Sequence, residues 1–158
     1  MTAWEKEGLV WGLGTDGPAG SNNDLNMFEA MDFAGKLAKI SKEDPTVLPA
    51  RTLVAAATRG GARALGLSDK IGSLEPGKRA DFILVGVANA HVQPFDDVYS
   101  TLVYSAKTSD VTDVWVDGRR LLANRRPTTL DEPAILAAAR HWRARVEASL
   151  AAAATPTK

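Results

Sequence analysis

A short apolar run near the start of the chain limits the possible folds more than any other sequence feature. Residues Leu9–Leu13 show no alternation of apolar and polar side chains, and Gly8 and Gly14 enclose them. Such a run is typical of a strand that is buried on both faces, as in a parallel sheet. The sequence therefore predicts an α/β fold. A strand of this kind needs neighbours on both edges, so it is unusual that the chain starts directly before it.

The segment after this strand is the candidate functional site. Residues 14–24 are rich in Gly, Asp, Asn, Ser and Thr, which favour tight turns, so the strand is expected to end near Leu13. Asp16 lies just beyond its carboxyl end, where parallel α/β proteins bind ligands, and a carboxylate there can coordinate a metal or accept a proton from water. Alternatively, Asp16 is a turn residue that binds the local backbone. Asn22 and Asn23 either contact a substrate or cap the next helix.

The remaining sequence alternates helical and β-type patterns. Asn26 and Glu29 have the spacing of a helix capping box, and the Asp117-Gly118 pair has the composition of a type I′ hairpin turn. The predicted elements are a helix at 24–41, a helix that starts at Pro49 and is split by Gly60-Gly61, a strand at 82–85, an antiparallel hairpin at 110–123, and a helix at about 133–153.

The last predicted helix is amphipathic. Its apolar residues recur every three or four positions and therefore share one stripe, while basic residues and one glutamate occupy its other faces. The stripe consists of Ile135, Ala139, Trp142, Val146 and Leu150.

The composition excludes several kinds of chemistry. The 158-residue chain has no cysteine, which excludes a disulfide, a zinc ribbon, an iron–sulfur cluster and a thiol nucleophile. His91 and His141 are its only histidines and lack metal-ligand spacing, so the chain cannot by itself build a histidine-rich metal centre. We expect His91 to be a loop or packing residue and His141 to be solvated.

Charge and hydropathy favour a small-molecule partner. The 19 basic residues balance the 19 acidic ones, so no long-range field would attract nucleic acid or an anionic membrane. No apolar run approaches the roughly 18 to 20 residues of a membrane helix, and the start of the chain lacks the pattern of a signal peptide. The expected location is cytoplasmic.

Several sequence blocks, in this order, resemble the C-terminal part of metal-dependent amidohydrolases. The resemblance runs from about Gly8 to about Leu150 and looks closest to the 5-methylthioadenosine/S-adenosylhomocysteine deaminase and chlorohydrolase group, together with guanine-deaminase-like enzymes. The blocks are Leu13–Ala19 (LGTDGPA), Ser21–Met27 (SNNDLNM), Ala57–Gly66 (ATRGGARALG), Ile71–Asp81 (IGSLEPGKRAD) and Val114–Arg119 (VWVDGR).

The resemblance implies a fold of two parts. One is the C-terminal fragment of a (β/α)₈ amidohydrolase barrel, of which Leu9–Leu13 would be the eighth strand. The other is part of a small β-rich composite domain. The implied divisions are 1–70 for the last barrel strand and helices, 71–128 for the β-rich segment, and 129–158 for the C-terminal helix and tail.

The resemblance also implies an activity and its site. Asp16 matches the aspartate at the end of the eighth strand, which binds or adjoins a single divalent metal, expected to be zinc, and receives a proton from the metal-bound water. Ser21, Asn22 and Asn23 match positions that contact the substrate. The implied reaction is hydrolytic deamination of an aminopurine nucleoside or a related amino-heterocycle, and a chlorohydrolase or guanine-deaminase-like activity is the alternative within the superfamily.

The histidine ligands of that family have no counterpart in this chain. A (β/α)₈ barrel takes about 250 residues. We therefore expect a fragment, produced by a misplaced gene start or by real truncation, that is inactive alone and needs the missing N-terminal barrel portion in cis or in trans. The alternative is a non-catalytic structural or interaction subunit. The unpaired edges of the strand at Leu9–Leu13 and its apolar side chains predict a homo-oligomer or aggregation.

Overall fold

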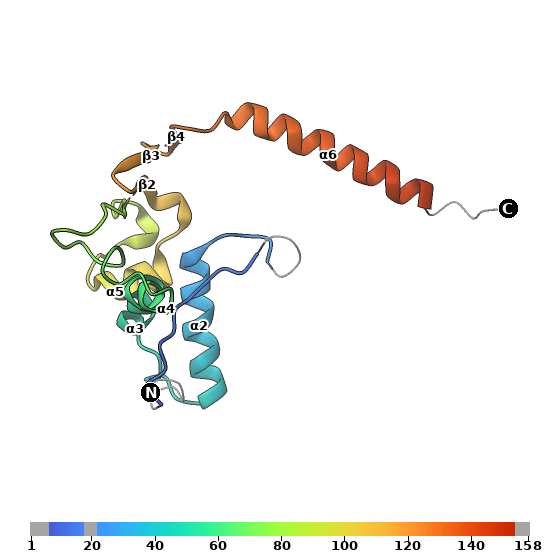
Figure 1. The fold of residues 1–158 in the computed structure, drawn as a ribbon. Coiled ribbons are helices and arrows are strands. Elements are labelled where there is room, and N and C mark those ends of the chain that lie inside the picture. Colours follow the sequence, from blue (N-terminus) through green and yellow to red (C-terminus); the bar gives the residue numbers. More distant parts are fainter. Residues whose placement is uncertain (1–6, 18–21, 154–158) are drawn as a thin grey trace.

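A computed structural model describes residues 7–17 and 22–153 (Figure 1). A group of helices forms one layer. The helices are α2 (Met27–Lys42), the short α3 (Ala50–Ala55), a π-helical turn η1 (Ala56–Gly60) and α4 (Gly61–Ala64). Later short helices are η2 (Ala90–Val92), α5 (Val98–Ser100), the π-helical η3 (Thr101–Ser105) and η4 (Thr108–Asp110).

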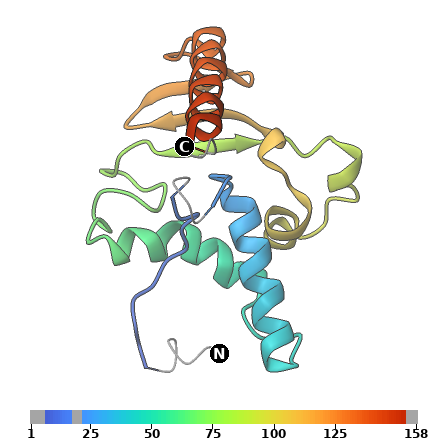
Figure 2. The ribbon, with the colours of Figure 1, turned by 90° about the vertical axis from the view of Figure 1, so that its right-hand side faces the viewer.

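A small antiparallel sheet lies beside this helical layer (Figure 2). Its strands are adjacent in the order β1 (Phe82–Val85), β2 (Val111–Val116), β3 (Arg119–Ala123) and β4 (Arg126–Pro127). In the register of β1 and β2, Phe82 pairs with Trp115, and their rings stack with centroids 4.6 Å apart. Such a cross-strand aromatic pair contributes about 0.5 to 1.5 kcal/mol beyond the area that it buries.

The expected hairpin is confirmed. The loop between β2 and β3 consists of Asp117 and Gly118, with φ of 51° and 74°. Positive φ at both central residues is what a type I′ turn requires. The helix predicted at 24–41 is also confirmed as α2, and Asn26 caps it by accepting a hydrogen bond from the Glu29 backbone N–H at 3.2 Å. The last predicted helix is α6 (Glu132–Ala153).

The buried core joins the helices to the segment after β1. Leu53 of α3 is fully buried and Val103 of η3 is 2% exposed. The other members are Phe28, Met31, Leu48, Ala50, Val92 and Ala106. The core thus contains residues from both of the first two expected ranges, 1–70 and 71–128, and those divisions stay a prediction.

Two expectations about local structure are wrong. Leu9–Leu13 is not a strand, and Leu9 and Val10 are more than half exposed instead of buried on both faces. The reason is that no strand among the described residues pairs with this segment, whose backbone bonds instead to a helix. Gly60-Gly61 does not split the second helix, because both residues keep right-handed helical dihedrals and the chain passes through a π-helical turn into α4.

The helix α6 extends away from the rest of the molecule (Figure 1). Every one of its residues is exposed. In the described part of the chain, no helix is long and apolar enough to cross a bilayer.

Candidate functional site

The segment that carries Asp16 lies against the helix formed by α3, η1 and α4. The Leu13 N–H donates to the Ala56 carbonyl at 3.3 Å. An α-helix offers few backbone acceptors to a neighbour, because its interior carbonyls are already bonded within the helix. At η1 the wider π-helical turn leaves the Ala56 carbonyl accessible, and it accepts from both Gly61 within the helix and Leu13 outside it.

This contact depends on Gly12, in the segment expected to be a strand, and on Gly60-Gly61, the pair expected to split the helix. A Cβ built on Gly12 would lie 2.6 Å from the Gly61 Cα, and one on Gly60 would lie 2.7 Å from the Trp11 carbonyl oxygen. The two backbones therefore approach more closely than any residue with a side chain permits. The signal in the sequence was the pair Gly60-Gly61 within an otherwise helical pattern.

Asp16 lies in the loop directly after this contact. It is exposed and has a φ of 59°, in the left-handed region that Asp adopts more readily than most residues. Its Oδ1 accepts a hydrogen bond from the Gly17 N–H at 2.6 Å. The described residues offer no partner to Oδ2. Asp16 therefore has the turn role that was one of its two interpretations, and one carboxylate oxygen is left to face a ligand.

Asn22 holds the loop closed. Its Nδ2 donates to the Thr15 carbonyl at 2.5 Å, its backbone N–H donates to Gly17, and its Oδ1 accepts from the Asp24 N–H. The structure thus brings Asn22 and the Asp16 turn together. Asn23 is exposed and is not the helix cap, which is Asn26. Ser21 lies outside the described residues.

The described residues do not fit a metal ion by themselves. No group of three or more His, Asp or Glu side chains among them is arranged to hold one. Asp16 alone offers one free carboxylate oxygen, whereas a catalytic zinc uses three protein ligands. The remaining donors would have to come from polypeptide outside the described part.

An apolar groove of about 610 Å³ lies between the helices and the sheet. Phe28 and Met31 of α2, Ala57 of η1 and Trp115 of β2 contribute to its walls. Asp81 is its only charged lining residue. Among the described site residues, Asp16, Asn22 and Asn23 do not line this groove.

One histidine belongs to a buried polar cluster away from the Asp16 loop. The Asp110 carboxylate, 2% exposed, accepts hydrogen bonds from Asn89 at 2.7 Å, His91 at 2.7 Å and the Lys107 backbone N–H at 2.8 Å. Burial by itself would raise the pKa of Asp110, but the bonds from His91, Lys107 and Asn89 outweigh it and hold the pKa below its ordinary value. His91 thus anchors a loop, as expected.

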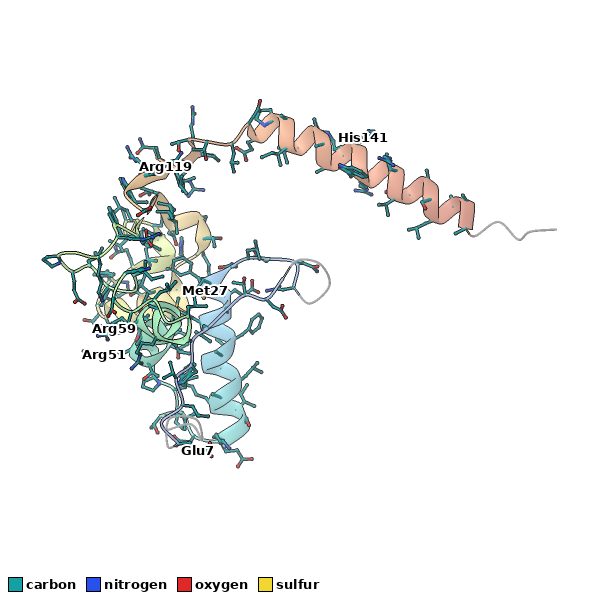
Figure 3. The ribbon with its side chains drawn as sticks, in the orientation of Figure 1. Glu7, Met27, Arg51, Arg59, Arg119 and His141 are labelled. Atoms are coloured by element: carbon teal, nitrogen blue, oxygen red, sulfur yellow. The ribbon has the colours of Figure 1, made fainter. Side chains whose placement is uncertain are left out.

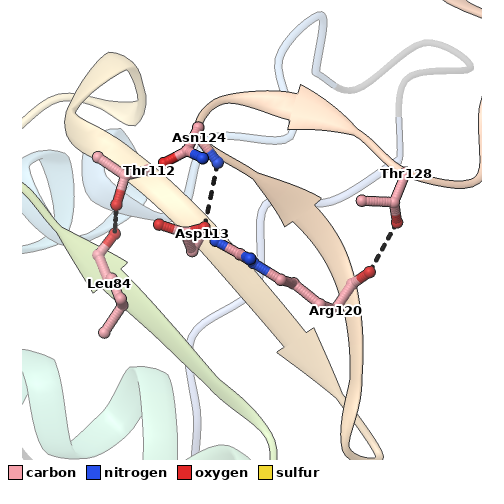
Figure 4. A network of polar contacts seen from close by, with 6 residues as sticks. All are labelled: Leu84, Thr112, Asp113, Arg120, Asn124 and Thr128. Atoms are coloured by element: carbon pink, nitrogen blue, oxygen red, sulfur yellow. Dashed lines mark hydrogen bonds and ion pairs between the residues drawn. The ribbon is translucent and has the colours of Figure 1, made fainter.

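A second buried carboxylate, Asp113, fixes the hairpin (Figure 4). The Arg120 guanidinium donates to it, with Nε at 3.1 Å, and the Asn124 N–H donates at 3.1 Å. The bond from Arg120 is the main reason why the pKa of Asp113 lies below its ordinary value. Both carboxylates are buried and bonded to structural partners, Asp110 through both oxygens and Asp113 through Oδ1.

Known proteins resemble this chain over most of its length. The model of the amidohydrolase family matches residues 2–121. A curated 5-methylthioadenosine/S-adenosylhomocysteine deaminase from Desulforudis audaxviator is 51% identical over 129 residues, which cover 82% of this chain and 30% of that protein. The chain thus spans about a third of the length of such relatives.

Solved structures of similar proteins also superpose on most of this chain. An adenosine deaminase from Xanthomonas campestris with bound zinc superposes with a TM-score of 0.87 and 44% identity, over 91% of this chain and 33% of its own. A variant of atrazine chlorohydrolase from Arthrobacter aurescens, complexed with zinc and atraton, superposes with a TM-score of 0.70 and 30% identity, over 85% of this chain and 30% of its own.

Proposed function

Because the chain belongs to the amidohydrolase family, we propose that it is the C-terminal part of an enzyme that deaminates an aminopurine nucleoside by hydrolysis. In this reaction water replaces the exocyclic amino group, so a carbon–nitrogen bond breaks, a carbon–oxygen bond forms and ammonia leaves. The observation that carries the proposal is the superposition on a zinc-bound adenosine deaminase over nine-tenths of this chain, with 44% identity.

Asp16 is the residue of this chain that we assign to the chemistry. The Gly12–Gly61 contact and the Asn22 hydrogen bonds set its loop, and the bond from Gly17 fixes one carboxylate oxygen. The other oxygen can accept a proton from the attacking water and pass it to the departing amine. Asn22, Asn23 and Ser21 stay candidates for substrate contact, although the side chain of Asn22 is already bonded within the loop.

The metal belongs to the completed enzyme. We propose a divalent ion, zinc in view of the zinc-bound relatives, with Asp16 as one ligand or neighbour and the remaining donors outside this chain. Such an ion lowers the pKa of bound water to about 7. The N-terminal barrel portion, in cis or in trans, is the partner that would supply the missing donors. The cytoplasmic location and the homo-oligomer stay predictions.

Three alternatives are weaker. A chlorohydrolase has the support of the 30% identical triazine enzyme, which is less than the 44% and 51% identity to adenosine-type deaminases. A guanine-deaminase-like activity stays the other alternative within the superfamily. A non-catalytic subunit would retain the fold without needing the carboxylate of Asp16.

A complementation assay tests the proposal. The chain is coexpressed with the remaining part of the Desulforudis audaxviator deaminase, 30% of which it matches, and ammonia release from 5-methylthioadenosine and adenosine is measured. We expect activity from the complex and none from either part alone. Asp16→Asn should lower the rate by about 10²- to 10⁴-fold without dissociating the complex. An active Asp16→Asn complex would rule out the assigned role, and a stable but inactive wild-type complex would favour the non-catalytic subunit.

A further inference from the structure

The helix α6 presents an apolar stripe that nothing in the described part of the chain covers. Ile135, Trp142, Val146 and Leu150 are 50%, 58%, 55% and 65% exposed. The stripe repeats every three or four residues, which is the spacing of a helix that packs lengthwise against another element. Figure 3 shows the side chains of α6, including the labelled His141, projecting from a helix that stands clear of the molecule.

At least part of α6 is matched in a longer solved enzyme. The helix holds 22 of the 158 residues, so an alignment that left it out would cover at most 86% of the chain. The superposition on the zinc-bound adenosine deaminase covers 91% and therefore includes part of α6. That enzyme has about three times the aligned length, since the match covers 33% of it. It thus contains polypeptide that has no match in this chain.

The charges beside the stripe argue against a second copy of α6 as the partner. At helical spacing, Arg143 and Arg145 border the stripe on opposite sides. The guanidinium of Arg145 lies 4.5 Å from the centroid of the Trp142 ring, and Arg143 pairs with Glu147 at 2.7 Å. In an antiparallel pair of α6 helices packed stripe to stripe, the borders that carry Arg145 would face each other, and like charges at such positions are destabilising.

We propose that α6 is a docking helix for the missing N-terminal barrel portion of the enzyme, and that it binds an apolar surface bordered by carboxylates. The inference rests on the proposed function, because it takes the partner to be the polypeptide that completes the deaminase. The apolar stripe supplies the buried area, and Arg145, which lies beside Trp142 in the stripe, selects the acidic border. The helix is about 33 Å long, so it spans a substantial part of a barrel surface.

Binding measurements on paired variants test the inference. The full chain, as wild type, Val146→Asp or Ala148→Asp, is titrated with the remaining part of the Desulforudis audaxviator deaminase. The two substitutions introduce the same charge into the same turn, but Ala148 lies on the face opposite the stripe. Both residues are exposed, so circular dichroism should show the same fold for all three proteins. We expect Val146→Asp to weaken binding by about tenfold or more and Ala148→Asp to leave it unchanged.

The possible results separate the two proposals. Equal affinities of Val146→Asp and Ala148→Asp, with a wild-type complex that forms and deaminates, would overturn the docking role of α6 and leave the proposed function intact. Sedimentation of the chain alone is the second measurement. If Val146→Asp abolishes self-association and leaves binding of the complement unchanged, α6 is an interface between copies and the inference is wrong. If the wild-type chain binds no complement, the proposed function and the inference both fail.

Discussion

At the scale of single residues, the buried carboxylate of Asp110 is the group whose replacement should lower the stability of the fold most. Three donors converge on it, from Asn89, His91 and the Lys107 backbone. Asp110→Asn keeps the size but turns an amide N–H₂ toward at least one of them. We expect the free energy of unfolding to fall by about 1 to 3 kcal/mol, measured by urea denaturation. Asp96→Asn, at an exposed site without a hydrogen bond among the described residues, is the matched control and should change little.

The same carboxylate makes the stability of the fold depend on pH. Because the folded pKa of Asp110 is lowered, the unfolded chain binds more protons in acid, and stability falls as the pH drops. The contribution is complete above the unfolded pKa of about 3.9 and is lost as the pH falls through the folded pKa. Melting temperatures measured between about pH 6 and pH 3 should decrease less steeply for Asp110→Asn than for wild type. An equal decrease in melting temperature over this pH range for the two proteins would contradict this.

The helix cap and the hairpin turn could be predicted from the sequence because each is formed by residues that are neighbours in the chain. Asn26 caps α2, and Asp117-Gly118 forms the hairpin turn, since each depends on only a few neighbouring backbone groups. The partners of Asn22 could not be chosen from the same information. An amide next to a turn can cap a helix, contact a substrate or close the loop, and only the path of the chain decides that it bonds to Thr15.

At the scale of elements, the glycine contact beneath the Asp16 loop should tolerate no side chain. Gly12→Ala places a Cβ 2.6 Å from the Gly61 Cα, where both atoms belong to backbone and one segment must shift. We expect a loss of about 1 to 3 kcal/mol in the free energy of unfolding and a lower deamination rate in the completed enzyme. Gly14→Ala is the control, because a Cβ there meets nothing within 4 Å. Equal stability of the two variants would show that the contact does not hold the loop.

The elements that sequence patterns misjudged are those whose partners lie far away in the chain or outside it. Leu9–Leu13 has the composition of a buried strand, but a strand forms only where another strand offers hydrogen bonds, and here the Ala56 carbonyl takes that place. The pair Gly60-Gly61 has low helix propensity, yet it stays helical because the close approach of Trp11 and Gly12 requires residues without side chains. The hairpin and the helices α2 and α6 were predicted correctly because the residues that pair within them are near one another in the sequence.

At the scale of the whole molecule, the described residues leave apolar surface exposed on several elements. The exposed stripe of α6, the groove of about 610 Å³ and the exposed Leu9 and Val10 lie on different elements. A chain that matches about a third of its relatives would expose such surfaces where the other two-thirds pack. The family was recognised correctly from the sequence blocks, because a sequence block can be recognised without knowing which surface it packs against.

The distribution of metal ligands gives the last test. Asp16 is one carboxylate, and the described residues form no group of three ligands, so the chain alone should not retain zinc after dialysis. The complex with the remaining part of the Desulforudis audaxviator deaminase should hold about one zinc ion per complex, measured by atomic absorption. Asp16→Ala should weaken that binding, while the exposed Asn23→Ala should not, because only the carboxylate is a zinc ligand by type. One zinc ion in the chain alone would mean that it builds a metal site of its own, and the idea of a shared centre would then fail.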